Sequence, residues 1–346
     1  MIDVNWLALD VGGANLKAAH SGGATRSSPF PVWKEPDRLA SAIAELAATF
    51  PPFDRVATTM TAELCDCFET KREGVLRIVD ALREALPGRP LAFWGIDGRF
   101  RDEASIRNLP LVAAASNWLA LATVAARTVG DKRAILIDVG TTTTDLIPLD
   151  AGRVAARGRT DLERLRNAEL VYAGVARTPV CALAVELPFQ GASTGLAAEF
   201  FATTRDVYLT LGDLSPVPDD QGTADGRPAT RERAGERLAR MVCADRESCS
   251  ARDVEELARA ADAVLLDRLV RAARQACAAT IGTPEVAVVS GSGEFLARRV
   301  AEAVVGPSGV IRPLGSLWGS GASGAACAHA LIELAREGGA IHAAEA

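Results

Sequence analysis

Short apolar runs that stop at glycine punctuate this chain and predict much of its secondary structure. Residues 6–11 (WLALDV) stop at a Gly-Gly pair and LKAAH follows, which predicts two strands joined by a glycine turn. The arrangement returns at residues 134–139 (AILIDV), which end at Gly-Thr before LIPLD continues. A third run, residues 285–304 (EVAVVSGSGEFLARRVAEAV), predicts a strand, a glycine turn and a helix. The chain therefore alternates strands and helices, which predicts an α/β fold.

Apolar stripes at helical spacing predict the main helices. They lie at residues 38–50, 75–86 and 253–279, and the nearly all-apolar segment 113–129 predicts a helix buried between domains. Strands are predicted at VATTMT (56–61) and LAFWGI (91–96), and a glycine- and alanine-rich segment (314–335) runs into a closing helix. Residues 212–233 lack any period and predict a functional loop or a disordered segment.

Length and charge narrow the class of protein. A chain of 346 residues suggests two domains, and 49% hydrophobic with 24% charged residues is typical of a soluble globular protein. The net charge of −6, the pI near 5.3 and the interspersed arginines argue against a nucleic-acid partner. No apolar run is long enough to predict a membrane span. The seven irregularly spaced cysteines and the lack of a secretory signal predict reduced thiols and a cytoplasmic protein.

Two of the glycine turns resemble each other. DVGGANLK (10–17) and DVGTTTTD (138–145) both follow an apolar strand and precede another, and we interpret them as an internal duplication at the scale of a domain. Chance is the alternative, because Asp-Val-Gly is a common tripeptide. The duplication predicts that the two turns face each other.

The residue types of these turns suit a polyphosphate. Glycine lets backbone N–H groups approach a phosphate closely, and threonine adds short hydroxyl donors. Aspartates suit a Mg²⁺ ion that bridges to the phosphate, partly through water, or the activation of a nucleophile. The alternative is a threonine-rich hairpin turn in which aspartate only forms the turn. The candidate metal ligands are Asp10 and Asp138, Lys17 is a candidate catalytic charge, and the candidate phosphate-binding residues are Gly12, Gly13, Gly140, Thr141, Thr142, Thr143, Gly291, Ser292 and Gly293.

The order of these motifs resembles the actin/sugar-kinase/Hsp70 (ASKHA) superfamily. DVGGANLK is similar to its first phosphate motif, DVGTTTTD to its second and VVSGSGEF to its adenosine motif, and residues 115–129 and 319–335 resemble its connecting helices. The resemblance implies two ribonuclease-H-like domains flanking a central cleft, residues 1–130 with a C-terminal helix (319–346) and residues 131–318 with an inserted loop (212–233). It also implies that ATP is a possible ligand. DVGTTTTDLI is similar to the hydantoinase/oxoprolinase branch, with a threonine where that branch has a second glycine.

Four longer stretches resemble a narrower family, the tetrahydromethanopterin-linked one-carbon transfer proteins. They are residues 59–75, 115–122, 160–180 and 223–228. Archaeal members resemble a synthase of the methanofuran core, which implies a transferase that joins an aminomethylfuran methyl diphosphate to γ-glutamyltyramine, or to a tyrosine-derived phenol, and releases pyrophosphate. The substrates would be a small diphosphate and a phenolic amine. The resemblance also leaves open that the chain forms a homodimer. An ATP-dependent kinase or hydrolase and a non-catalytic nucleotide switch remain as alternatives.

The narrower resemblance adds substrate-site candidates. Asn15, Asp161 and Arg177 are candidate substrate ligands, of which Asp161 and Arg177 lie in the resembling stretch. Glu63 and Asp66, with Glu69, are spaced by three and predict one helix face that carries a catalytic base or binds an amine; a solvated acidic face is the alternative. The TADG segment (223–226) is a candidate lid or a mobile surface loop.

Overall fold

The computed structural model describes residues 4–318 and 323–337, which form two six-stranded sheets and a small hairpin. The first sheet has the order β3-β2-β1-β4-β5-β6. Its strands β1, β4 and β5 are parallel, whereas β2, β3 and β6 pair antiparallel to their neighbours. The bounds are β1 (Trp6–Val11), β2 (Asn15–His20), β3 (Thr25–Pro29), β4 (Arg55–Met60), β5 (Leu91–Trp94) and β6 (Phe100–Arg101).

The second sheet repeats this plan. Its order is β10-β8-β7-β13-β14, with β9 also paired to β8. Here β7, β13 and β14 are parallel, and β8 is antiparallel to β7 as β2 is to β1. The shared order supports the predicted duplication. The bounds are β7 (Ala134–Val139), β8 (Thr144–Asp150), β9 (Arg153–Val154), β10 (Leu170–Val171), β13 (Val286–Ser290) and β14 (Val310–Pro313).

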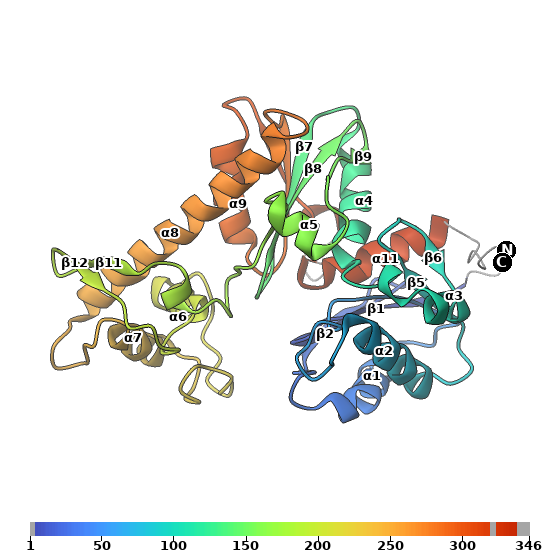
Figure 1. Cartoon of the computed structure of the whole chain (residues 1–346), viewed down its shortest axis with the longest axis horizontal. Helices are drawn as coiled ribbons and strands as arrows, with labels where there is room; N and C mark the ends of the chain where they lie inside the picture. The colour runs from blue at the N-terminus through green and yellow to red at the C-terminus, as the bar shows by residue number, and fades with distance from the viewer. Residues whose placement is uncertain (1–3, 319–322, 338–346) are drawn as a thin grey trace.

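Helices cover the outer faces of both sheets and also separate them (Figure 1). Outside the first sheet lie α1 (Leu39–Ala48) and α2 (Lys71–Ala85), with α3 (Glu103–Asn108) beside β5. Outside the second lie α8 (Ala251–Ala278) and α9 (Glu294–Val304). Between the sheets, α4 (Asn117–Val129) packs on α11 (Ala326–Glu337). The shorter elements are α5 (Asp161–Arg166), α10 (Gly315–Trp318) and four 3₁₀ turns at Pro36–Arg38, Pro110–Val112, Val180–Ala182 and Ser323–Ala325.

Strand alternation decides which side chains face the space between the sheets. On β1, Leu7 and Leu9 pack outward against α1 and α2, whereas Ala8 packs inward against α4 and α11. On β7, Ile137 packs outward and Leu136 inward. The inward positions that follow are residues 10 and 138, so both motif aspartates face the junction of the two halves.

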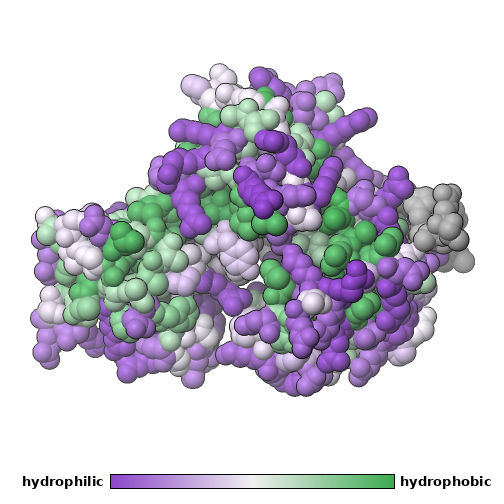
Figure 2. Space-filling model, in the orientation of Figure 1, coloured by the Kyte–Doolittle hydropathy of each residue, from purple (hydrophilic) through white to green (hydrophobic). Residues whose placement is uncertain are grey.

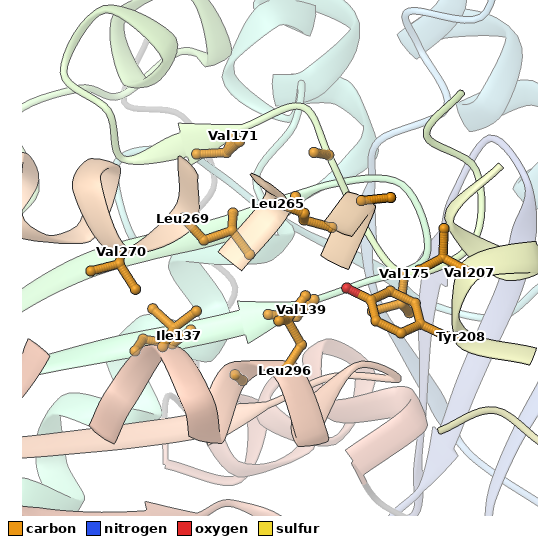
Figure 3. Close-up of a cluster of buried hydrophobic side chains, with 14 of the residues drawn as sticks. Ile137, Val139, Val171, Val175, Val207, Tyr208, Leu265, Leu269, Val270 and Leu296 are labelled. Carbon is orange, nitrogen blue, oxygen red and sulfur yellow. The ribbon is translucent and has the colours of Figure 1, made fainter. Parts of the chain in front are cut away.

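The outward side of β7 fixes the end of that strand. Figure 3 shows Ile137 and Val139 pointing into an apolar cluster with Leu265 and Leu269 of α8 and Leu296 of α9. All five side chains are buried. This packing holds the strand rigidly up to the residue before its glycine turn.

An arm projects from the second half at the far end of α8 (Figure 1). It consists of β11 (Glu186–Phe189), β12 (Ala192–Gly195), α6 (Thr204–Leu211) and α7 (Arg231–Arg240), which pack against α8. Figure 2 shows apolar surface on this arm, beside the hollow that separates it from the first half.

The segment predicted to be irregular, residues 212–233, overlaps the start of a helix. Helix α7 begins at Arg231, capped by the Thr230 side chain, so the irregular segment ends earlier. The segment is folded onto α6 and α7 because the fully buried Arg237 binds both Asp206 and Asp225. Asp225 belongs to the TADG segment (223–226), which this ion pair holds against the arm.

The described residues also bear on the predicted C-terminal helix. Helix α11 ends at Glu337, and residues 319–322 and 338–346 of the predicted segment lie outside the described residues. All seven cysteines are free thiols. Among the described helices, none combines the length and apolarity needed to cross a membrane.

Candidate active site

The first glycine turn has backbone N–H groups that no described residue accepts from. Gly12 N donates to Asn15 O at 3.1 Å, and the Gly13 carbonyl accepts from Val32 N at 2.9 Å. Within the described part of the chain, the N–H groups of Gly13 and Ala14 have no acceptor. A buried or half-buried N–H without a partner is costly unless a ligand or water accepts from it. The first turn is thus arranged to donate to a ligand.

The second turn has the same arrangement. Gly140 N donates to Thr143 O at 2.9 Å, and the Thr141 carbonyl accepts from Arg177 N at 2.9 Å. The N–H groups of Thr141, Thr142 and Thr143 have no acceptor among the described residues. The duplicated hairpins therefore supply five unengaged backbone donors, two from one turn and three from the other.

Gly174 supports the second turn from behind. A Cβ at this position would lie 2.4 Å from Gly140 O and 2.6 Å from Thr142 N, far inside van der Waals contact. The next residue, Val175, donates its N–H to Gly140 O at 3.0 Å. Only glycine allows this approach. Sequence reasoning did not single out Gly174, because the contact joins segments about thirty residues apart.

The two turns meet at one cavity of about 390 Å³. Gly13 and Ala14 line it from the first half, and Thr142 and Thr143 line it from the second. Asp161 and Arg164 of α5 line it as well. The structure thus brings the two sequence-predicted phosphate turns together, while no residue of the predicted lid lines the cavity.

Four charged side chains lie at the base of the turns. In the strand register, Asp10 lies opposite Lys17 in the first hairpin, and Asp138 lies opposite Asp145 at the matching position in the second. Burial raises the pKa of Asp10, which Lys17 partly offsets. Burial raises the pKa of Asp138 to about 6, with a further increase from Asp145 and an opposing effect of Lys17. Lys17 thus acts on aspartates of both halves.

This base fits the predicted magnesium ion. The Oδ1 atoms of Asp10 and Asp138 are buried and have no hydrogen-bond partner among the described residues. Carboxylate oxygens are the ligands that Mg²⁺ prefers, and it usually keeps several waters. No cluster of three or more His, Cys, Asp or Glu side chains is assembled for a metal in residues 4–318 and 323–337. An ion held by the two aspartates would therefore complete its coordination with water or substrate oxygens.

Arg164 is a site residue that sequence reasoning missed. Its side chain is only 2% exposed, binds Asp145, and reaches Asp161 at 3.3 Å. Its guanidinium lies 4.2 Å from the centre of the Trp118 ring, and it lines the cavity. The sequence DLERLR around it has the alternating charges of a surface helix, which hid this burial. Arg164 thus neutralises Asp145 and Asp161, whereas Lys17 acts on Asp10 and Asp138.

Exposed residues of both halves meet at the outer end of the cavity, which we call its mouth. The Arg177 guanidinium lies 4.4 Å from the centre of the Trp33 ring, and the two residues come from opposite halves. Tyr172, Cys65 and Asp66 also line the cavity. Burial raises the pKa of the Cys65 thiol to about 11, so the thiol stays protonated at neutral pH and is a poor nucleophile.

The predicted helix face of Glu63, Asp66 and Glu69 does not exist. Residues 61–70 form successive turns, and α2 begins only at Lys71, where the Thr70 side chain caps it. The strong N-cap starts the helix after the acidic residues, so their spacing by three was coincidental. Asp66 lies on the cavity, whereas Glu63 does not.

Glu63 lies behind the cavity wall. It is 1% exposed, and its Oε2 has no hydrogen-bond partner in the described chain. Burial raises its pKa to about 7, with smaller effects that include repulsion from Asp161. Glu63 is thus a buried acid beside the site rather than a residue of its surface.

The third glycine turn lies against the second rather than on the cavity. A Cβ on Gly291 would lie 2.2 Å from Val139 O and 2.8 Å from Asp138 Oδ1. Gly293 N donates to Val139 O at 2.8 Å, and Ser292 is exposed. None of the three residues lines the cavity. The turn packs against the end of the strand that carries Asp138 and supports it.

The fold and the site together define the class of protein. The chain superposes on acetone carboxylase, solved without nucleotide, with a TM-score of 0.55 and 11% identity, over 95% of this chain and 70% of that one. The fold is that of the ASKHA superfamily, in which two related domains flank a central cleft. The Hydantoinase/oxoprolinase family matches residues 54–334. This chain belongs to that family.

Two curated archaeal relatives are more similar in sequence. A protein of Methanocaldococcus jannaschii is 39% identical over 244 residues, which cover 70% of this chain and 72% of the relative. A protein of Methanococcus vannielii is 37% identical over 140 residues, which cover 40% of this chain and 63% of the relative. Both relatives are named (4-{4-[2-(gamma-L-glutamylamino)ethyl]phenoxymethyl}furan-2-yl)methanamine synthase.

Proposed function

We propose that this chain is a transferase of methanofuran-type cofactor biosynthesis. It condenses an aminomethylfuran methyl diphosphate with the phenol of γ-glutamyltyramine and releases pyrophosphate. The product named for both curated relatives contains this aryl ether. The observation that carries the proposal is the meeting of two duplicated turns at one cavity, which is lined by four residues with unengaged N–H groups: Gly13, Ala14, Thr142 and Thr143.

The two turns (residues 12–14 and 140–143), which we call the cradle, fit the diphosphate leaving group. Gly13 and Ala14 line the cavity together with Thr142 and Thr143, and none of their N–H groups has an acceptor among the described residues. Preorganised donors of this kind stabilise charge that develops on a leaving group. Asp10 and Asp138 would hold Mg²⁺, which supplies neutralisation of the diphosphate charge when bound. Lys17 reduces the mutual repulsion of these carboxylates.

A base is needed for the acceptor, because a phenol has an unperturbed pKa near 10. We assign Asp161, a half-buried carboxylate that lines the cavity and whose pKa is raised chiefly by burial. The bond from the phenolic oxygen to the furfuryl methylene carbon forms, and the bond from that carbon to the diphosphate oxygen breaks. Pyrophosphate leaves with the electron pair, and Asp161 takes the phenolic proton. Arg164 holds Asp161 in place.

A direct assay tests the reaction. The purified chain, with Mg²⁺, aminomethylfuran methyl diphosphate and γ-glutamyltyramine, should yield the ether by mass spectrometry and an equal amount of pyrophosphate. Asp161→Asn should lower kcat by about 10²- to 10⁴-fold, with pyrophosphate affinity retained. The matched control is Asp219→Asn, an exposed aspartate of the arm. Pyrophosphate release without ether, or ATP turnover in place of ether formation, would overturn the proposal.

A further inference from the structure

Two side chains of opposite charge at the cavity mouth have no ionic partner. The Arg177 and Asp66 side chains both line the cavity and are exposed. Neither forms an ion pair or a side-chain hydrogen bond with any residue that the structure describes; Arg177 only stacks on Trp33. By contrast, Arg164 in the same cavity is engaged by two carboxylates. The mouth therefore holds one cation and one anion that are available to a ligand.

The two charges line the same cavity, and each lies within electrostatic range of the Cys65 thiol. Both act on the Cys65 thiol, whose pKa is raised by Asp66 and lowered by Arg177, after the larger effect of burial. They come from opposite halves of the molecule, Asp66 after β4 and Arg177 after β10. The guanidinium lies over the Trp33 ring, and its N–H donors have no side-chain partner among the described residues, so they are available to a planar carboxylate.

We propose that Arg177 and Asp66 bind the free α-amino acid group of the phenolic acceptor, the carboxylate at Arg177 and the ammonium at Asp66. The inference rests on the proposed function, in which the acceptor is γ-glutamyltyramine. Its glutamyl unit is linked through the γ-carboxyl, so one end of the molecule is a zwitterion and the other is the phenol. The zwitterion stays at the exposed mouth, and the phenol reaches inward to Asp161.

This arrangement separates the two anions of the reaction. The diphosphate is received by the backbone donors of the half-buried turns, whereas the acceptor carboxylate meets the guanidinium of the exposed Arg177. The exposed ring of Tyr172 and the exposed Leu64 line the same mouth and give the aryl and methylene parts of the acceptor apolar surface. Recognition of the acceptor thus depends on residues other than those that bind the leaving group.

Acceptor analogues test each charge separately. N-glutaryltyramine lacks the α-ammonium group, and N-(4-aminobutanoyl)tyramine lacks the α-carboxylate. Calorimetric titration of these and of γ-glutamyltyramine, with Mg²⁺ and pyrophosphate present, measures binding without turnover. Arg177→Met should weaken γ-glutamyltyramine and N-glutaryltyramine by about 10- to 100-fold and leave N-(4-aminobutanoyl)tyramine unchanged, since a hydrogen bond between charged groups is lost. Asp66→Asn should weaken γ-glutamyltyramine and spare N-glutaryltyramine.

The binding experiment has its own controls, and its failure can be told apart from failure of the proposed reaction. Arg166→Met, an exposed arginine off the cavity, and Asp219→Asn should bind every acceptor as the unaltered chain does. If Arg177→Met weakens pyrophosphate instead of the acceptor, or weakens all three acceptors equally, the assignment is wrong. If the pattern of acceptor binding holds but no ether forms, the proposed reaction fails while the acceptor subsite stands. Absence of γ-glutamyltyramine binding to the unaltered chain would overturn the subsite.

Discussion

The buried carboxyl of Glu63 makes the stability of this protein depend on pH in a defined direction. In the unfolded chain its pKa is 4.5, and in the folded chain burial raises the pKa to about 7. Between these values the native state holds a proton that the unfolded state has lost. Stability contributed by this group is therefore complete below the unfolded pKa and is lost as the pH rises through the folded pKa.

The magnitude follows from the shift. One pKa unit corresponds to about 1.4 kcal/mol, so the shift from 4.5 to about 7 corresponds to about 3 kcal/mol of unfolding free energy. Glu63→Gln keeps the shape and removes the titration. We expect the difference in unfolding free energy between the unaltered chain and Glu63→Gln to change by about 3 kcal/mol between about pH 4 and about pH 8.5, with the unaltered chain losing stability.

Urea unfolding at a series of pH values, followed by circular dichroism, measures this difference. Other titrating groups cancel because both proteins contain them. Glu69→Gln alters an exposed glutamate of the same segment, and its curve should run parallel to that of the unaltered chain. Parallel curves for Glu63→Gln as well would refute the reasoning, since they would mean that Glu63 titrates alike in the folded and unfolded states.

Two further substitutions test the framework of the site. Gly174→Ala should displace the second turn, because the new Cβ would lie 2.4 Å from Gly140 O. The affinity for pyrophosphate, measured by calorimetry, should fall at least about tenfold. Gly195→Ala, where a Cβ meets nothing within 4 Å, should leave that affinity unchanged. Arg164→Met should lower the unfolding free energy by about 3–5 kcal/mol, because it leaves the buried carboxylate of Asp145 without its ion-pair partner. If the double variant Arg164→Met/Asp145→Asn loses as much stability as the two single variants added together, the two residues do not form a stabilising pair.

The repeated strand–glycine pattern predicted the fold well because it is local. Alternation along β1 and β7 follows from period-two burial, and it places Asp10 and Asp138 on the same inner face. The positions of the first two glycine turns could be predicted for the same reason. These features depend on neighbours within a few residues, and such neighbours can be read directly from the chain.

The residues that were missed depend on contacts between distant segments. Gly174 is required only because its loop presses on Gly140, and Arg164 is buried only because Asp145 and Trp118 enclose it. Charge alternation in α5 is the same for a buried and an exposed arginine. The supposed helix face around Glu63 failed for the opposite reason, since a local cap at Thr70 overrode an apparent period.

The duplicated hairpins are not chemically identical, and the difference gives the cradle a direction. At matching positions one hairpin carries Lys17 and the other Asp145. Two lysines would make a symmetrical seat in which a diphosphate fits equally well either way round. Unlike charges would give the two phosphoryl groups of the proposed diphosphate distinguishable sites, so that its esterified carbon would lie on one side only.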